Sequence, residues 1–126
     1  MALKSIGIVG CGAIGKALIN AVAAGKLAVR VAGVTSRTET SAREFLSKIK
    51  TPPPFLTLDE LIDASDLLVE AAGGAVVPGL AEKAFAARKD LMVISLDALL
   101  DHPEIIEESR SGLRDRWWDR SRSSGT

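Results

Sequence analysis

The sequence of 126 residues contains a single cysteine, Cys11, and a single histidine. One cysteine leaves no partner for a disulfide and excludes a cysteine-based metal site, so no metal ligands are predicted. The formal net charge is zero, which gives no sign of nucleic acid or an anionic membrane as a partner. No apolar run reaches transmembrane length, and the run before Cys11 is too short for a signal peptide. We therefore expect a soluble, cytoplasmic protein of one domain.

The feature that organises the sequence is a glycine-rich turn between an apolar run and a helical segment. Ile6–Val9 has the pattern of a buried parallel strand, Gly10-x-Gly12-x-x-Gly15 follows at once, and a helix is expected over about Ala13–Ala24. This order is typical of dinucleotide binding. Gly10 permits the tight turn, Gly12 lets the backbone approach a pyrophosphate, and Gly15 lets the helix pack against the strand. The pyrophosphate would rest on free N–H groups at the positive end of the helix dipole.

A second strand is predicted at Val29–Thr35, within the span of one βαβ unit. An NAD-preferring site would place Asp or Glu after it to bind the ribose hydroxyls, but this sequence has Ser36-Arg37-Thr38. A guanidinium beside two hydroxyls suits a 2′-phosphate, and no carboxylate repels it. The cofactor is therefore predicted to be NADP or NAD, with NADP(H) accepted. The alternative is that Arg37 stacks on adenine or points into solvent.

Alternating strands and helices continue along the chain and predict an α/β fold with a Rossmann-type, doubly wound parallel sheet. The strand at 67–69 is expected beside the first strand, and the domain is expected to span residues 1–110. The further elements expected are a helix capped by Thr38 or Thr40 and running to about Ile49, a short strand at Phe55-Leu56, a helix at Asp59–Asp63, strands at Leu67–Val69 and Leu91–Ile94, a helix at Gly79–Ala87 after Pro78, and a charged helix at Glu104–Arg110.

Two segments after predicted strands are expected near the nicotinamide end of a cofactor, because ligands bind beyond the carboxyl ends of parallel strands. Small residues at 71–74 leave room for the nicotinamide ribose or ring, and the segment 95–99 closes the last strand at the same edge. Two roles are open for Glu70: it approaches the ribose or the substrate, or it is a structural carboxylate that caps the next helix. His102 lies in a polar turn without a catalytic partner, so a surface histidine is expected and no catalytic residue is assigned.

The segment 111–126 differs in composition from the rest of the chain. After Leu113 it has no aliphatic residue, and Trp117 and Trp118 stand among arginines before a Ser/Gly-rich end. A basic, aromatic segment can suggest contact with nucleic acid. Because it has no periodicity and no core-forming pattern, a disordered C-terminal tail is the interpretation favoured here, with no nucleic-acid partner.

Three segments of the chain resemble the L-aspartate dehydrogenase family: 7–15, Val69-Glu70-Ala71-Ala72, and 88–99 with its Ser95-x-x-Ala98-Leu99. The likeness covers residues 4–110, which correspond to the family's N-terminal dinucleotide domain. It implies oxidation of L-aspartate to iminoaspartate with NAD(P), feeding NAD biosynthesis or releasing oxaloacetate and ammonia. By residue match it also implies pyrophosphate contacts from Gly10, Gly12, Ala13, Ile14 and Gly15, adenosine ribose contacts from Ser36 and Arg37, and positions near the nicotinamide for Ala71, Ala72, Ser95 and Ala98.

The chain departs from this family in two respects. Asp97 stands where the family usually has glycine, which adds a carboxylate close to the ring. Members of the family continue into an α+β substrate domain that carries the catalytic histidine and forms the oligomer. The hypothesis is that this chain is a truncated, frameshifted or alternatively spliced product. Alone it would bind dinucleotide but oxidise aspartate poorly or not at all.

Two further interpretations stay open at this point. The chain could be a non-catalytic dinucleotide-binding or regulatory module, or the cofactor domain of another oxidoreductase such as homoserine dehydrogenase. An amino-acid substrate is expected only if a catalytic domain is supplied. A homo-oligomer is also expected, because apolar faces that lack this domain favour self-association.

Overall fold

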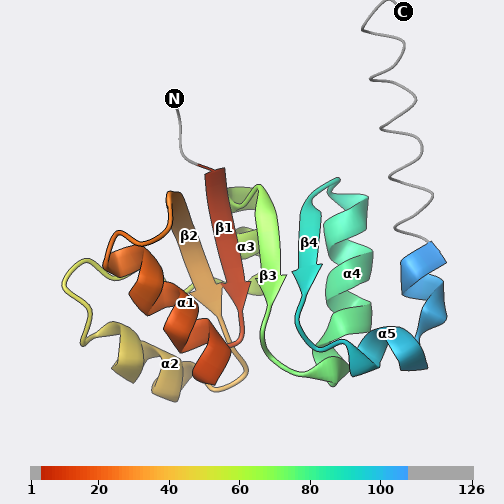
Figure 1. The fold of residues 1–126 in the computed structure, drawn as a ribbon, viewed down its shortest axis with the longest axis horizontal. Coiled ribbons are helices and arrows are strands. Elements are labelled where there is room, and N and C mark those ends of the chain that lie inside the picture. Colours follow the sequence, from red (N-terminus) through yellow and green to blue (C-terminus); the bar gives the residue numbers. More distant parts are fainter. Residues whose placement is uncertain (1–3, 108–126) are drawn as a thin grey trace, which may run out of the picture.

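The computed structural model describes residues 4–107 and contains one four-stranded parallel sheet with helices on both faces (Figure 1). The strand order is β2-β1-β3-β4, and all four strands end at the same edge of the sheet. The α/β, Rossmann-type fold predicted from the sequence is confirmed. The elements in chain order are β1 (Lys4–Val9), α1 (Ala13–Ala23), β2 (Val29–Thr35), α2 (Glu39–Leu46), α3 (Leu58–Ala64), β3 (Leu67–Glu70), the 3₁₀ turn η1 (Gly74–Val76), α4 (Val77–Ala86), β4 (Asp90–Val93) and α5 (Asp97–Asp101).

The central strand β1 is buried on both faces because helices cover each side of the sheet. Ile6 and Ile8 pack on one face with Ile19 of α1, while the alternate residue Val9 packs on the other face. Ile8 is completely buried. Truncating such a side chain to alanine removes its apolar contacts and leaves a cavity, at a cost of about 2–5 kcal/mol. The position of β1, and hence of the turn that follows it, is therefore strongly determined.

The register between β1 and β2 brings two glycines side by side under α3. The pairing shifts by one residue after Ile6, so that Gly7 is opposite Gly33. A Cβ on Gly7 would lie 2.8 Å from Leu61 Cγ, and a Cβ on Gly33 would lie 2.6 Å from Leu56 Cδ1. The two glycines thus make room for the fully buried Leu61, which lets α3 pack closely on the sheet.

The connection from α2 to α3 differs from the prediction at two points. The helix ends at Leu46 rather than near Ile49, because the amides of Lys48 and Ile49 donate to carbonyls three residues back and close tighter turns. The strand expected at Phe55-Leu56 is a single bridge between Phe55 and Val34 of β2. Because proline has no N–H, the carbonyl groups of residues 52–54 can accept hydrogen bonds, but these residues cannot donate the amide hydrogen bonds of a strand.

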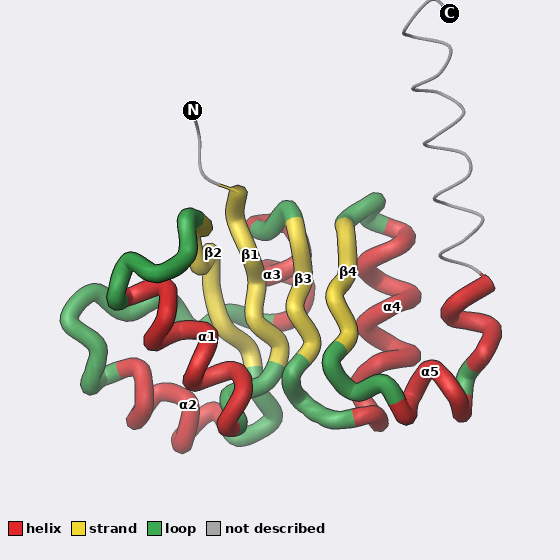
Figure 2. The backbone as a smooth tube through the Cα atoms, in the orientation of Figure 1, coloured by secondary structure: helices red, strands yellow, loops and turns green. Residues whose placement is uncertain are grey.

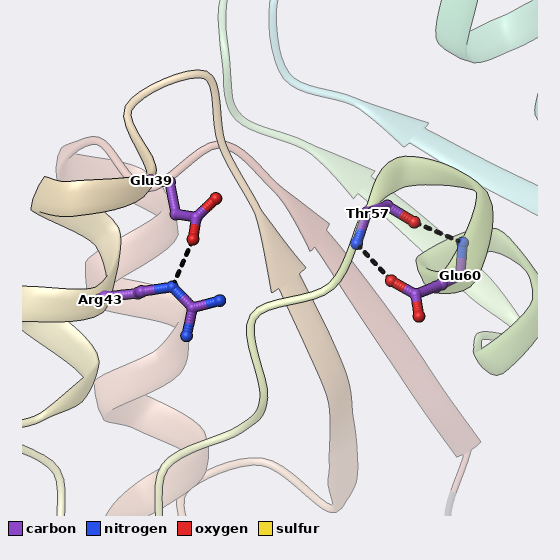
Figure 3. Close-up of polar contacts among 4 residues, drawn as sticks. All are labelled: Glu39, Arg43, Thr57 and Glu60. Carbon is purple, nitrogen blue, oxygen red and sulfur yellow. Dashed lines mark hydrogen bonds and ion pairs between the residues drawn. The ribbon is translucent and has the colours of Figure 1, made fainter.

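Polar side-chain contacts are present in the first turns of two helices, α3 and α2. Thr57 and Glu60 form a capping box at the start of α3, in which each side chain accepts a hydrogen bond from the other residue's backbone amide (Figure 3). In α2, Glu39 in the first turn pairs with Arg43 one turn later, at 2.6 Å (Figure 3). The α2 helix begins after Thr38, as predicted, although the Thr38 side chain makes no capping hydrogen bond.

Some predictions fall outside the described residues. The charged helix expected at Glu104–Arg110 is helical over 103–107, and residues 108–110 lie outside the described part. The same holds for the predicted tail at 111–126, with Trp117 and Trp118, and for the domain boundary at 110. Among the helices within residues 4–107, none has the length and apolar character needed to cross a membrane.

Candidate functional site

The loops that follow β1, β2, β3 and β4 gather along the carboxyl edge of the sheet, and together they form the candidate site (Figure 2). At the centre is the glycine turn between β1 and α1. Gly10 has a φ of 106°, and a Cβ there would lie 2.6 Å from Ala71 O and from Ala72 Cα. A Cβ on Gly15 would collide with the carbonyl oxygen of Gly10. Both glycines are therefore required by the protein itself, to fit the turn against the β3 loop and α1.

Gly12 differs from these two glycines, because nothing in the protein requires it. A Cβ at Gly12 would have no heavy atom within 4 Å. Its φ of −84° and ψ of −160° are extended values that any residue adopts. Gly12 is the N-cap of α1, with no side-chain cap and no acid in the first turn. The first turn thus offers amide groups to open space at the positive end of the helix, which fits a phosphate anion.

The loop after β2 lies beside this turn, because the amide of Gly10 donates to Thr35 O at 2.8 Å. The hydroxyl oxygens of Ser36 and Thr38 are 3.4 Å apart, and the Thr38 amide donates to Ser36 Oγ at 3.3 Å. Arg37 is exposed and forms no hydrogen bond or ion pair with the other residues of the described range 4–107. The structure therefore leaves the guanidinium of Arg37 without a partner, in a loop that also carries the hydroxyls of Ser36 and Thr38.

On the other side of β1, the loops after β3 and β4 are joined by the buried carboxylate of Glu70. Its Oε2 accepts hydrogen bonds from the amides of Ala72 and Gly73, both at 2.9 Å, and from Ser95 Oγ at 2.8 Å. Its Oε1 accepts from the amides of Ser95 and Ile94, at 2.9 and 3.2 Å. Glu70 is completely buried, so approach to a ribose does not describe these contacts. The predicted role as a structural carboxylate is correct, but Glu70 bonds the two loops and does not cap the next helix. It holds two loops together.

The hydrogen bonds also fix the charge of Glu70. Burial raises the pKa of this carboxyl, but the hydrogen bonds from Ser95, Gly73 and Ala72 outweigh it and hold the pKa below its usual value. Glu70 is therefore an anion at neutral pH, balanced by donors rather than by a cation.

The remaining candidate residues near this side are the small residues of the two loops. Ala71 and Ala72 are half-buried and lie against Gly10. Ala98 is buried, in the cluster that contains Val77 and Ala81 of α4. Asp97 is exposed at the start of α5, and a Cβ on Gly74 would lie 3.2 Å from its Oδ2. The loops after β3 and β4 thus meet, with a free carboxylate at their junction.

A family described as the NAD-binding domain of homoserine dehydrogenase matches residues 10–114 of the chain. The chain belongs to this family of NAD-binding domains. The open space at Gly12 and the first-turn amides of α1 fit the pyrophosphate of such a cofactor, and NAD or NADP is the cofactor class that the family binds.

This NAD-binding domain is similar to proteins named L-aspartate dehydrogenase, as its sequence motifs indicated. It is 36% identical to L-aspartate dehydrogenase 3 of Bordetella bronchiseptica over 107 residues, which are 84% of this chain and 39% of that protein. It is 36% identical to the L-aspartate dehydrogenase of Methanocella arvoryzae over 106 residues, again 84% and 39%. The chain spans about two-fifths of the length of these relatives and matches their N-terminal part.

The fold of the domain is shared with solved dehydrogenase structures. A homoserine dehydrogenase from Thiobacillus denitrificans superposes with a TM-score of 0.74 at 18% identity, over 89% of this chain and 28% of that one. At this identity the likeness shows the fold.

Cys11 and His102 carry potentially reactive side chains, and the structure shows the environment of each. Burial raises the pKa of the Cys11 thiol, and nearby Lys16 lowers it by less, so the thiol is protonated at neutral pH. His102 is paired with exposed Glu104, with 3.2 Å from Nδ1 to Oε1, at the surface of the α5 region.

The connection of Glu70 to the β4 loop is the feature that was not predicted from the sequence. A signal for it was present, since an acid at the end of an apolar strand needs hydrogen-bond donors if it is buried. The donors of the β4 loop, however, are 24 and 25 residues away in the sequence, and only the sheet brings them to the carboxylate.

Proposed function

We propose that this chain is the cofactor-binding part of an NAD(P)-dependent oxidoreductase that acts on the CH–NH₂ group of L-aspartate. The reaction would oxidise L-aspartate to iminoaspartate, which water converts to oxaloacetate and ammonia. The similarity to two L-aspartate dehydrogenases at 36% identity supports the substrate, and the glycine turn with its open space at Gly12 supports the coenzyme.

In this proposal each loop of the carboxyl edge contacts one part of the dinucleotide. The backbone of the glycine turn and the first turn of α1 binds the pyrophosphate, the β2 loop binds the adenosine ribose, and the β3 and β4 loops face the nicotinamide. This division follows the general rule that the two mononucleotide halves lie on either side of the central strand. The residues assigned to the three parts are Gly10, Gly12, Ala13, Ile14 and Gly15, then Ser36 and Arg37, then Ala71, Ala72, Ser95 and Ala98.

We further propose that the β2 loop accepts the 2′-phosphate of NADP(H). Arg37 carries an unpaired guanidinium, while the one acid that opens α2, Glu39, is paired with Arg43. A phosphate monoester between a guanidinium and the hydroxyls of Ser36 and Thr38 gains charge-assisted hydrogen bonds, and no carboxylate opposes it. The lack of a competing partner for Arg37 supports this role over a purely structural one.

The chemical step places two demands on the protein: orientation of the coenzyme and removal of a proton from the substrate amine. When bound, the coenzyme supplies the acceptor for the hydride. The described residues at the carboxyl edge bind and orient it. They include no histidine or lysine placed at the nicotinamide end, since His102 is paired with Glu104 at the surface. We therefore assign the proton acceptor to the part of the relatives that this chain does not match.

A titration of the purified chain with NADPH, followed by addition of L-aspartate, tests the proposal. We expect a saturable change in NADPH fluorescence, and with NADP⁺ and aspartate a rate of NADPH formation close to background. Absence of saturable binding would overturn the proposal that the chain holds a coenzyme. Rapid aspartate-dependent reduction of NADP⁺ would overturn the assignment of the proton acceptor to another part of the protein.

A non-catalytic, dinucleotide-sensing module is the second candidate, favoured by the same lack of a placed base among residues 4–107. The two candidates differ once the unmatched part of a relative is supplied as a second polypeptide. A cofactor domain then gains aspartate-dependent turnover, whereas a sensing module binds dinucleotide as before. Offering homoserine in place of aspartate in the same assay tests the substrate suggested by the family description.

A further inference from the structure

Glu70 is the one fully buried acid among residues 4–107, and it has no cation beside it. Burying an unpaired carboxylate costs several kcal/mol unless hydrogen bonds replace its water. Here five donors do so, and every one of them belongs to the loop after β3 or the loop after β4. The carboxylate therefore acts as a clamp between two loops that are distant in sequence.

The clamp fixes the shape of one side of the cofactor cleft. The loop whose amides it holds at Ala72 and Gly73 lies so close to Gly10 that a Cβ on Gly10 would be 2.6 Å from Ala72 Cα. The second loop, held through Ser95, continues into Asp97, which lies against Gly74 of the first. Movement of the carboxylate would shift both loops relative to the glycine turn. The β2 loop, on the other side of β1, shares no hydrogen bond with Glu70 or its donors among the described residues.

We propose that Glu70 is a positioning residue for the nicotinamide half of the bound coenzyme. It acts through Ala72, Gly73 and Ser95, and it does not touch the ligand, because its carboxylate is completely buried. Its loss then weakens binding of the nicotinamide ring and leaves binding of the adenosine and pyrophosphate parts almost unchanged. This inference rests on the proposed function, since it needs a coenzyme that lies across the carboxyl edge.

The substitution Glu70→Gln, measured with two ligands, tests the inference. An amide keeps the size of the side chain but brings an NH₂ group to face donors, so one side of the clamp loses its acceptor. The ligands are NADPH and 2′-phospho-ADP-ribose, which is the same molecule without the nicotinamide ring. We expect NADPH affinity to fall at least about tenfold, the effect of losing a charge-assisted hydrogen bond. Affinity for 2′-phospho-ADP-ribose should stay within about twofold.

Glu60→Gln is the matched control, because it makes the same chemical change at a glutamate that bonds only Thr57 in the capping box. We expect it to leave the ratio of the two affinities unchanged, even where it lowers stability. Ser95→Ala removes one donor of the clamp, the Oγ hydroxyl. It should lower the affinity for NADPH relative to that for 2′-phospho-ADP-ribose by about threefold. If Glu70→Gln does not fold, Glu70→Asp, which keeps the charge but shortens the reach to both loops, is measured with the same two ligands in its place.

Equal losses for the two ligands, or no loss for either, would overturn the inference and leave Glu70 a structural residue only. That result differs from failure of the proposed function, in which the unmodified chain itself binds neither NADPH nor 2′-phospho-ADP-ribose. A selective loss of affinity for NADPH in the folded Glu70→Gln variant supports both the inference and the proposed function.

Discussion

The carbonyl oxygen of Gly10 lies so close to Gly15 that a Cβ on Gly15 would collide with it, so the glycine turn and the first turn of α1 are in direct backbone contact. Gly12, between them, has only open space around the position of its missing Cβ. Glycine is thus needed at the three positions of this motif for different physical reasons. Two are demanded by the packing of the protein, and the third keeps a space free next to the amides of the helix N-terminus.

This difference predicts opposite behaviour for substitutions in the same motif. Gly12→Val should lower affinity for NADPH at least about tenfold, since it displaces a phosphate from its amide donors. Its urea midpoint should fall less than that of Gly15→Ala, because a Cβ at Gly12 meets no heavy atom within 4 Å and the remaining cost is that of a poorer N-cap residue. Gly15→Ala should destabilise the fold by about 1–3 kcal/mol through the clash with Gly10. Fluorescence titration and urea denaturation of both variants check this, and unaltered NADPH binding by Gly12→Val would contradict the proposed site.

We expect Arg37 to determine the preference between NADPH and NADH. Arg37→Gln should reduce NADPH affinity about tenfold or more and change NADH affinity less than twofold, because only NADPH carries the 2′-phosphate. Arg88→Gln is the control, because it removes an exposed arginine between α4 and β4, away from the β2 loop, and should leave both affinities unchanged. Dissociation constants for both coenzymes decide the matter. A clear preference of the unmodified chain for NADH would count against the assignment.

Acid should destabilise the protein through Glu70. The folded state lowers the pKa of this carboxyl, so its contribution to stability is present above the unfolded pKa, about 4.3, and is lost as pH falls through the folded pKa. Urea unfolding at a series of pH values should show stability falling below about pH 4.3. In Glu70→Gln the slope should be smaller, by up to about 1.4 kcal/mol per pH unit, since one titrating group is removed. Equal slopes would show that Glu70 does not titrate with folding.

The apolar surface of β4 and the α5 region predicts self-association. Met92, Leu96 and Leu100 are 52%, 64% and 83% exposed, which is unusual for such large apolar side chains on one part of a molecule. Sedimentation velocity over a concentration series should show a dimer or larger species, weakened by Leu100→Gln. Leu27→Gln, at an exposed leucine between α1 and β2, is the control that should leave association unchanged. A monomer at every concentration would contradict the expectation.

Much of the fold could be predicted because its signals are local. The strand at Val29–Thr35 has the predicted bounds, and the first helix ends within one residue of its predicted end at Ala24, next to Gly25 with its φ of 75°. Glycine, proline and apolar periodicity act through neighbouring residues, so the sequence alone reports them. The contacts proposed for Ser36, Arg37 and the other cofactor residues come from the family resemblance, and the measurements above test them.

The contacts that define the site's shape were decided by tertiary structure. Whether Glu70 would cap a helix or reach a ligand depended on which donors the register of β3 and β4 placed beside it, and these belong to residues 94 and 95. Room for Leu61 likewise depended on the one-residue shift that sets Gly7 opposite Gly33. By itself the sequence determined which segments become strands, turns and helices, because those preferences are local. The pairing of strands decided which buried groups meet, since hydrogen bonding and close packing join residues that the chain order keeps apart.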